Sequence, residues 1–521
     1  MKRRNFLRAT GVFPFFTGEF IQALSKNGKE ETDPVSLQPI PAPAAERPFF
    51  YKPENAWAAD FIPFFAEGKF QLFYLLDWRD AEKYGEGTPW YRLSTTDFVH
   101  FTEHGEVIPR GGKEEQDLYI FTGCAIKGPD QQYHIFYTGH NHHLAEKDKP
   151  MQGVMHAVSP DLQHWKKIPE HVFFAPAKGY EKHDWRDPFV FFNEETGEYN
   201  MLLAARFTEG ISRRRGLTAL CSSKDLIKWE VKQPFYAPNQ YFTHECPDLF
   251  RIGDWWYLVF SEFTEQVATR YRMSRSLKGP WLTPVQDTFD GHAFYAAKTA
   301  SDGRHRYIFG WNPTRSENKD NGGWNWGGNL VVHQLKQEAD GRLTVQVPAS
   351  VPAAFSQPVV PEFRNAAGKM IGSKQVDLKA AGRFEVVSGG KMPSTCRIKT
   401  TVQFKQGTRD FGVSLRCSDD FEKSYYIRLE PSRSRLVFDM WPRPVNEVYQ
   451  QVELERMIAL PATTPVTIEL FMDGTMGVVY VNNTVAMNFR AYDLKEGNWG
   501  FFVNDGEARF SAVELSVLPS V

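Results

Sequence analysis

Short apolar and aromatic runs recur along the first two thirds of the chain, and glycine, aspartate or asparagine separates them. Runs of this kind are typical of β-strands bounded by turns. The 3.6-residue spacing of amphipathic helices is scarcely visible over the same stretch. The pattern therefore predicts an all-β fold. Five of the runs are similar to one another: 69–74, 132–137, 198–203, 255–260 and 306–311.

A second series of segments recurs with a spacing of 64 residues. Asp97, Asp161 and Asp225 are each followed by an apolar residue and, four positions on, by an aromatic residue; a weaker copy covers 274–281. Self-similarity at such a period indicates repeated units that bury their faces only by stacking. Five units of several strands predict a five-bladed β-propeller. The alternative is a β-sandwich array with chance similarity.

The repeat ends near residue 350, but strand-like runs continue to the C-terminus. Their spacing, with turns such as Asp473-Gly474 between them, is typical of a β-sandwich. We therefore expect a propeller in residues 49–350 and a C-terminal β-sandwich in residues 351–521. The predicted sandwich strands are 397–404, 411–415, 425–429, 436–438, 466–471, 476–481, 499–503 and 510–515.

The first 48 residues differ from the rest. Arg3 and Arg4 precede a short apolar run at 12–16, and residues 26–48 contain five prolines. A twin arginine before a short apolar stretch is typical of an export leader. We predict a leader and linker over 1–48 and an exported protein, periplasmic or extracellular. The alternative is a basic terminus of a cytoplasmic protein. No segment is long and apolar enough to predict a membrane span.

Composition argues against several classes of function. The 521 residues include 61 Lys and Arg against 63 Asp and Glu, a net charge of −2. This balance gives no support for a nucleic-acid or anionic-membrane partner. The five cysteines form no CxxC pair, so neither a disulfide framework nor a zinc–cysteine site is expected. The high aromatic content, 15%, suits short strands and flat surfaces that stack on sugars.

Acidic residues stand just before the aromatic runs. Asp60, Asp187 and the pair Glu245 and Asp248 fall at the start of the first predicted strand of three units. First strands line the channel of a propeller, so these carboxyl groups should converge on one axial pit, where like charges raise one another's pKa. Glycoside cleavage uses such groups, one as nucleophile or base and one as general acid. We predict Asp60, Asp187 and Glu245 as the site, with Asp248 in a turn or cap.

Two other candidates favour structural explanations. His140, His142 and His143 could suggest a metal site, but no acidic ligand stands at metal spacing. A polar loop is the preferred interpretation, and we predict no metal and no cofactor. Cys246 could act as a nucleophile, yet a small buried residue is the simpler interpretation.

Several of these motifs resemble those of glycoside hydrolase family 32, the group of invertases, inulinases and levanases. Arg186-Asp187-Pro188 matches the family's Arg-Asp-Pro motif, and Glu245-Cys246-Pro247 matches its Glu-Cys motif. The segment 121–125 is similar to its aromatic–Ser–Gly segment. Further likenesses lie in the fifth predicted blade (294–296 and 310–311) and in the sandwich (468–483). The resemblance implies a five-bladed propeller followed by a β-sandwich.

The resemblance also implies a reaction. It makes Asp60 the nucleophile, Glu245 the general acid/base, and Asp187 the group that binds fructosyl hydroxyls in the transition state. The expected enzyme is a retaining β-fructofuranosidase, with an oligo- or polysaccharide containing fructofuranosyl units as its substrate. The residues expected to bind this substrate are Trp57, Phe121, Thr122, Arg186 and Trp311.

The first motif departs from the family's Trp-Met-Asn-Asp-Pro-Asn-Gly. Here Ala59 precedes Asp60 and Phe61 follows it, so an asparagine that helps to hold the terminal fructose is missing, and Leu75 replaces a usual glutamine. Two alternatives stay open. One is an inverting furanosidase acting on arabinofuranosides. The other is a non-catalytic glycan-binding propeller that stacks sugars on tryptophans: Trp57, Trp185 and Trp311.

Overall fold

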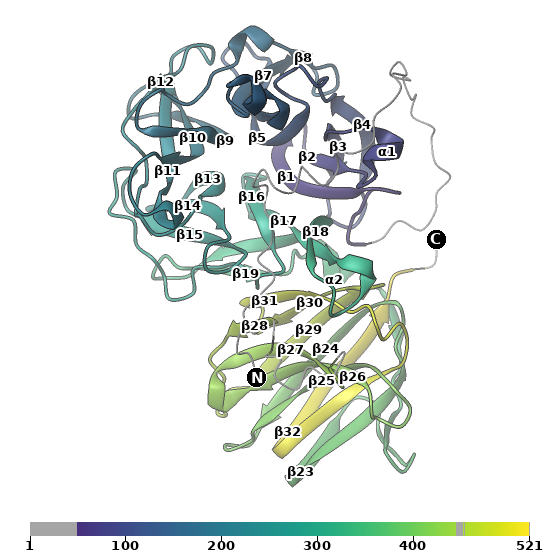
Figure 1. The fold of residues 1–521 in the computed structure, drawn as a ribbon. Coiled ribbons are helices and arrows are strands. Elements are labelled where there is room, and N and C mark those ends of the chain that lie inside the picture. The colour runs from purple at the N-terminus through teal and green to yellow at the C-terminus, as the bar shows by residue number, and fades with distance from the viewer. Residues whose placement is uncertain (1–48, 444–451, 453, 520–521) are drawn as a thin grey trace, which may run out of the picture.

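The computed structural model describes residues 49–443, 452 and 454–519, and β-strands dominate it (Figure 1). The leader and linker predicted for 1–48 lie outside the described residues. No described helix is long and apolar enough to cross a membrane. The described helical elements are short: α1 (Ala81–Tyr84), α2 (Ser350–Ala354), η1 (His142–Lys147), η2 (Pro169–His171), η3 (Ser212–Arg214), η4 (Ser316–Asn318) and η5 (Pro431–Arg433).

The first nineteen strands form five antiparallel blades. Blade I holds β1 (Trp57–Ala66), β2 (Lys69–Asp77), β3 (Trp90–Thr95) and β4 (Thr102–Ile108). Blade II holds β5 (Tyr119–Lys127), β6 (Tyr133–His140), β7 (Gln152–Ser159) and β8 (Lys166–Lys167). Blade III holds β9 (Tyr180–Asn193), β10 (Glu198–Phe207), β11 (Gly216–Ser223) and β12 (Glu230–Val231). Blade IV holds β13 (Glu245–Ile252), β14 (Trp255–Glu262) and β15 (Ala268–Ser274). Blade V holds β16 (Tyr295–Ser301), β17 (Arg306–Arg315), β18 (Trp324–Gln337) and β19 (Leu343–Gln346).

The blades close into a ring. The first strands contact one another in cyclic order, β1 with β5, β5 with β9, β9 with β13, β13 with β16, and β16 with β1. Figure 1 shows these five strands around the centre and β4, β8 and β12 at the periphery. Ala58 of β1 pairs with Gly328 of β18, which joins the first and last blades in one sheet. The predicted five-bladed β-propeller is confirmed.

The 64-residue repeat corresponds to a turn that follows the third strand of a blade. Asp97, Asp161 and Asp225 each accept hydrogen bonds from the backbone N–H groups two and three positions on. These bonds stabilise the turn, where the backbone has no neighbouring strand to pair with. The apolar residue after each aspartate is buried, at a positive φ: Phe98 (62°), Leu162 (63°) and Leu226 (62°).

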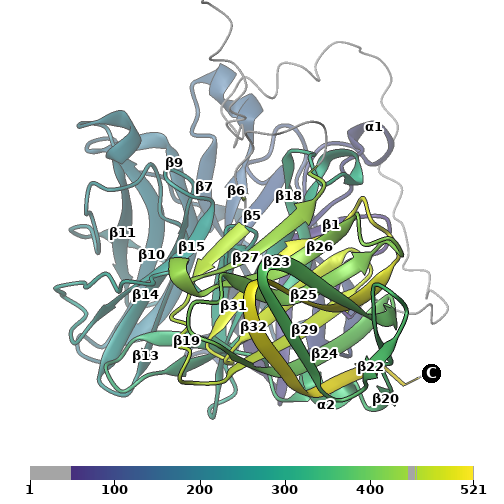
Figure 2. The same cartoon turned by 90° about the horizontal axis from the view of Figure 1, so that it is seen from below.

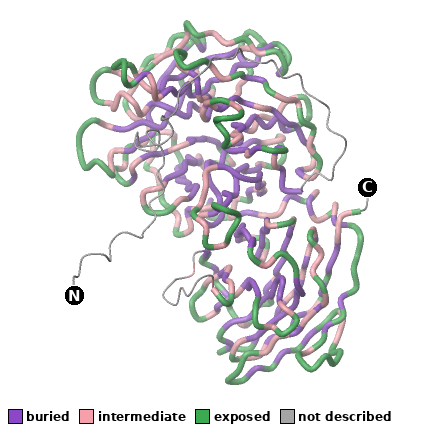
Figure 3. Tube along the Cα trace, turned by 45° about the vertical axis from the view of Figure 1, so that its right-hand side comes forward, coloured by how far each residue is buried: buried purple, intermediate pink, exposed green. Residues whose placement is uncertain are grey.

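The remaining strands form the predicted β-sandwich, which lies against one side of the propeller (Figure 2). The buried residues of its core lie between its two layers of strands, and the exposed residues lie mainly in loops and along the outer strands (Figure 3). The strands are β20 (Gln357–Val359), β21 (Phe363–Asn365), β22 (Met370–Gly372), β23 (Val376–Lys391), β24 (Thr395–Phe404), β25 (Asp410–Cys417), β26 (Ser424–Glu430), β27 (Arg435–Trp441), β28 (Leu454–Met457), β29 (Val466–Asp473), β30 (Met476–Val481), β31 (Val485–Arg490) and β32 (Asn498–Val517).

One strand prediction is wrong. The sequence predicts separate strands at 499–503 and 510–515, but both runs belong to β32, which is 20 residues long. The polar residues between them form no hairpin. Instead the strand bends at Asp505 and Gly506, with φ values of 51° and 157°, and stays paired with β23 on both sides of the bend. Its first half pairs with β25 and its second half with β24, so β32 joins the two layers.

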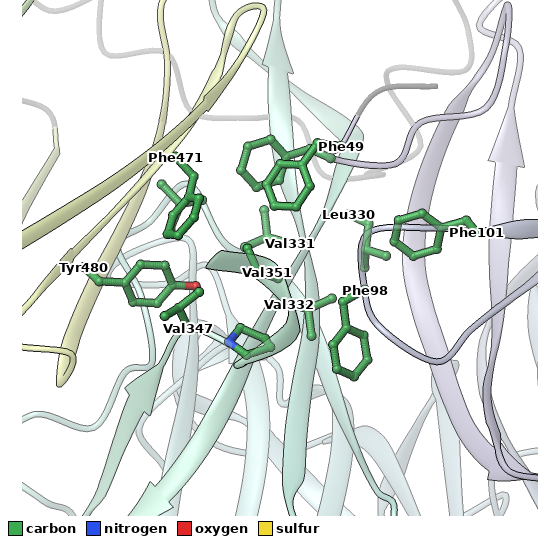
Figure 4. Close-up of a pocket in the computed structure, with 13 residues that line it drawn as sticks. Phe49, Phe98, Phe101, Leu330, Val331, Val332, Val347, Val351, Phe471 and Tyr480 are labelled. Atoms are coloured by element: carbon green, nitrogen blue, oxygen red, sulfur yellow. The ribbon is translucent and has the colours of Figure 1, made fainter. Parts of the chain in front are cut away.

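The propeller and the sandwich meet across an apolar pocket and a buried polar network. Figure 4 shows Phe49, Phe98 and Val331 on the propeller side of the pocket, facing Phe471 and Tyr480 of the sandwich. Burial of this apolar surface holds the two parts together. Next to the pocket, His333 of β18 lies between Asp290 Oδ2 (2.9 Å) and the hydroxyl of Tyr480 (2.8 Å).

Candidate active site

The first strands carry β-bulges at one level around the axis. In blade I, Asp60 and Phe61 lie opposite a single residue of β2, Tyr74. In blade III, Asp187 and Pro188 lie opposite Leu203. A bulge redirects a side chain and ends regular pairing. The first bulge residue has a positive φ in four blades: Asp60 (46°), Asp187 (58°), Cys246 (51°) and Ala296 (50°).

The bulges correct the alignment of the blades. In the sequence, steps of 64, 63 and 61 residues align Asp60 with Cys124, Asp187 and Asp248. The bulge of blade II instead falls between Phe121 and Gly123, which makes Thr122 the counterpart of Asp60, and Cys246 is the counterpart in blade IV. Asp248 lies beyond its bulge, where Oδ2 accepts a hydrogen bond of 2.5 Å from the backbone N–H of Thr299. It therefore links blades IV and V from within β13, so the prediction of a turn or cap is wrong.

The three predicted acids meet at the axis, and each has its own set of donors. Asp60 accepts hydrogen bonds from Thr122 Oγ1 to Oδ2 (2.5 Å) and from Trp311 Nε1 to Oδ1 (2.8 Å). Glu245 accepts from Arg186 Nη2 (3.0 Å) and from the hydroxyl of Tyr295 (2.6 Å). These donors fix the orientation of both carboxylates, because charge-assisted hydrogen bonds are short and directional.

Asp187 lies between the other two acids in the contact network. Its Oδ2 accepts the backbone N–H of Cys246 (3.0 Å). The sulfur of Cys246 lies 3.6 Å from Thr122 Oγ1 and 3.9 Å from Asp187 Oδ2. Arg186 Nε lies 3.7 Å from the same carboxylate oxygen. The site is therefore one connected cluster drawn from blades I to V.

Burial raises the pKa values of the three acids, and mutual repulsion adds to the rise for Asp60 and Glu245. Burial raises the pKa of Asp60 to about 7; the hydrogen bonds from Thr122 and Trp311 oppose this rise, and the charges of Asp187 and Glu245 add to it. Burial likewise raises the pKa of Asp187 and of Glu245, against the attraction of Arg186. The cluster thus retains protons at pH values where exposed carboxyl groups are ionised, as general acid catalysis requires.

Cys246 has the structural role expected of it. Burial, followed by the charge of Asp187, raises the pKa of its thiol well above the usual value. A protonated thiol is a weak nucleophile. The residue packs between acids and supplies a backbone donor to one of them.

The residues expected to bind substrate make three kinds of contact. Three of them hold the acids: Arg186 contacts Glu245 and Asp187, while Thr122 and Trp311 donate hydrogen bonds to Asp60. Trp311 is only 1% exposed, so its ring cannot offer a face to a sugar. Phe121 stacks on His140 at 4.8 Å.

Trp57 makes a third kind of contact. It lies at the start of β1, where Lys52 Nζ and the Arg79 guanidinium lie 4.6 and 4.5 Å from its ring centroid. Trp185, a stacking residue in the glycan-binding alternative, is 0% exposed and packs on Tyr180 and Phe173. Burial removes that surface and weakens the alternative.

Sequence reasoning missed Tyr295 as a site residue. It directly precedes the bulge of blade V, as Arg186 and Glu245 precede theirs. Aligning the blades on their bulges rather than on their acids would have placed it at the axis. Asp184 was also missed; its Oδ1 accepts a hydrogen bond of 2.6 Å from Arg186 Nη1.

Comparison with known proteins agrees with this geometry. Residues 50–348 match the model of the glycosyl hydrolases family 32 N-terminal domain. The chain is 23% identical over 439 residues to an insoluble isoenzyme of beta-fructofuranosidase from Arabidopsis thaliana, covering 74% of this chain and 73% of that one. It is 28% identical over 304 residues to raffinose invertase from Escherichia coli, covering 53% and 59%.

Solved structures share the fold. Fructan 1-exohydrolase IIa from Cichorium intybus superposes with a TM-score of 0.69 at 15% identity, covering 91% of this chain and 97% of that one. Exo-inulinase from Aspergillus awamori gives the same TM-score and identity, covering 91% and 99%. The family model spans more than half of the chain, with the three acids inside the matched region. The protein is therefore a glycosidase that belongs to glycosyl hydrolase family 32.

Proposed function

We propose that the protein hydrolyses terminal β-fructofuranosyl linkages, of the sucrose or fructan type, with retention of configuration. The observation that carries this proposal is that two acids at the axis, Asp60 and Glu245, are oriented by different hydrogen-bond donors. Relatives named as a beta-fructofuranosidase and a raffinose invertase support a fructofuranosyl substrate. Membership of the family disfavours the arabinofuranosidase alternative.

In the proposed first step, Asp60 attacks the anomeric carbon while Glu245 gives its proton to the leaving oxygen. Thr122 and Trp311 leave the carboxylate of Asp60 in one orientation, which keeps the entropy cost of attack low. The raised pKa of Glu245 keeps its proton available.

In the second step a water molecule attacks the fructosyl ester on Asp60, and Glu245 takes the proton of that water. The ester bond breaks, the carboxylate of Asp60 is restored, and Glu245 is protonated for the next cycle. Asp187 is proposed to accept hydrogen bonds from ring hydroxyls, because Arg186 and the Cys246 N–H hold it in place.

The test compares the native protein with the variants Asp60→Asn and Glu245→Gln, using sucrose as the substrate. Proton NMR of the first-formed fructose should show the β-anomer before mutarotation. Both variants should lose at least about 10³-fold in kcat, because each removes a group that acts in the transition state. First appearance of the α-anomer would contradict retention. Near-normal turnover by either variant, with folding checked by circular dichroism, would contradict the assignment of that residue.

We also propose export through the twin-arginine leader. The support is the sequence Arg3-Arg4 before the apolar run 12–16. Fractionation of cells that express the full chain, compared with Arg3→Lys/Arg4→Lys, tests it. Export that is unaffected by the double substitution would contradict the proposal.

A further inference from the structure

Two histidines and a glutamate from separate loops meet at the edge of blades I and II. Glu86 follows α1 in the β2–β3 loop, and His142 and His143 begin η1 in the β6–β7 loop. Glu86 Oε1 lies 3.2 Å from His142 Nε2, and Glu86 Oε2 lies 3.0 Å from His143 Nε2. One ligand atom from each residue lies within 4.8 Å of the others. This is the acidic ligand that sequence spacing did not reveal, since it stands 57 positions from His143.

His142 is the member of the cluster that needs an explanation. Its side chain is 10% exposed. Both of its ring nitrogens are buried and make no hydrogen bond within the described part of the chain, although Nε2 lies only 3.2 Å from Glu86 Oε1. A buried imidazole without hydrogen bonds is costly. A bound cation would use the lone pair of Nε2.

The surroundings hold the three side chains in place. The hydroxyl of Tyr119 donates to Glu86 Oε1 (3.1 Å). Arg110 donates to the backbone carbonyls on both sides of Glu86, those of Gly85 (3.3 Å) and Gly87 (3.0 Å). Asn141 Oδ1 accepts the backbone N–H of His143 (3.0 Å). Such outer contacts orient the ligands of metal sites.

We propose that Glu86, His142 and His143 bind a divalent transition-metal ion of the zinc type. Zn²⁺ favours imidazole nitrogen and carboxylate oxygen at about 2.0–2.2 Å in a tetrahedron. Neighbouring ligand atoms then lie about 3.3 Å apart. Here each histidine lies at a similar separation from one of the two Glu86 oxygens, 3.2 Å from Oε1 to His142 and 3.0 Å from Oε2 to His143. Glu86 and His143 are 24% and 34% exposed, which provides an entry path and room for a water as fourth ligand.

The site would clamp two loops on the catalytic side of the propeller. Trp57, at the start of β1, pairs with Asp77 at the end of β2, and Tyr119 pairs with His140 at the end of β6. The β2–β3 and β6–β7 loops therefore leave their blades on the side where Asp60 lies. The stack of Phe121 on His140 connects this edge to Thr122, which holds Asp60.

The experiment titrates untagged, chelator-treated protein with Zn²⁺ by calorimetry, and with Co²⁺ by visible absorption. The native protein should bind one equivalent, gain thermal stability, and give the intense visible bands of four-coordinate Co²⁺. Glu86→Gln and His142→Gln should lose this binding. Tyr119→Phe should weaken it by about 10- to 100-fold, because it removes only the hydrogen bond to the ligand.

The matched control is His164→Gln. His164 Nδ1 also lies close to a carboxylate, Asp161 Oδ2 at 2.7 Å, but its side chain is 82% exposed. This variant should bind metal like the native protein. The proposal is overturned if the native protein binds no metal, if Glu86→Gln binds as tightly as the native protein while remaining folded, or if His164→Gln loses the binding. None of these readouts depends on hydrolysis.

Discussion

Trp311 Nε1 donates a hydrogen bond of 2.8 Å to Asp60 Oδ1, although 251 positions separate the two residues in the chain. The bond joins the last blade to the first at the axis of the propeller. The role of the indole is therefore to orient the carboxylate of Asp60, since the ring is too buried to stack on a sugar.

Trp311 and Thr122, the two donors to Asp60, together influence the pKa of its carboxyl group. Hydrogen bonds from Trp311 and Thr122 lower the pKa of Asp60 against the effect of burial. Thr122→Val removes one donor while keeping the shape of the side chain, so the pKa should rise above about 7. The nucleophile must be ionised, so the acidic limb of kcat/KM should move to higher pH, by about one unit. A pH profile on sucrose measures the shift; an unchanged or lower acidic limb would contradict it.

Tyr295 should control the basic limb of the pH profile of kcat/KM. Its hydroxyl lowers the pKa of Glu245. Tyr295→Phe should raise that pKa and move the basic limb of kcat/KM to higher pH, because the general acid must be protonated. The acidic limb serves as the internal control. A shift of the acidic limb alone would assign the hydrogen bond to a different carboxyl group.

Asp60 should cost stability at neutral pH. Folded Asp60 keeps its proton up to about pH 7, whereas an unfolded aspartate releases it near pH 4. Stability from this group is therefore present below pH 4 and lost as pH rises to 7 and beyond. Asp60→Asn should raise the free energy of unfolding at pH 8, by up to about 4 kcal/mol, and by little at pH 4. Denaturant unfolding at both pH values measures this. The exposed Asp254→Asn is the control, and an equal effect at both pH values would exclude the titration of Asp60 as the cause.

Arg490 should couple the sandwich to the site. It is buried and donates to the carbonyls of Asn312 (2.9 Å) and Pro313 (3.1 Å), directly after Trp311 in β17. Arg490→Met keeps much of the volume but leaves buried carbonyls without this donor, so the free energy of unfolding should fall by about 2–4 kcal/mol.

The matched control for Arg490 is Arg509→Met. Arg509 is a sandwich arginine whose ion pair with Asp377 (2.6 Å) is exposed. Its loss should change stability by about 0.5 kcal/mol or less. Similar losses in the two variants would show that the contact with β17 contributes nothing beyond an ordinary arginine.

The sequence by itself determined the all-β class, the five-fold repeat and the identity of the three acids. Strand periodicity and turn residues are local properties, so they can be read along the chain. The aspartate turns at 97, 161 and 225 repeat because each blade needs the same connection. The sequence predicts two strands in place of β32 because Asp505 and Gly506 resemble a turn, while only the pairing with β23 shows a continuous strand.

Tertiary structure alone decided which residues surround the three acids. The bulges that set Asp60, Thr122 and Asp187 at one level arise from pairing with the neighbouring strand, which sequence spacing does not encode. Closing the ring brought Trp311 to Asp60, and the packing of two loops brought Glu86 to His142. Contacts between distant segments depend on how blades stack against one another, and the donors that orient the acids share no local pattern with them.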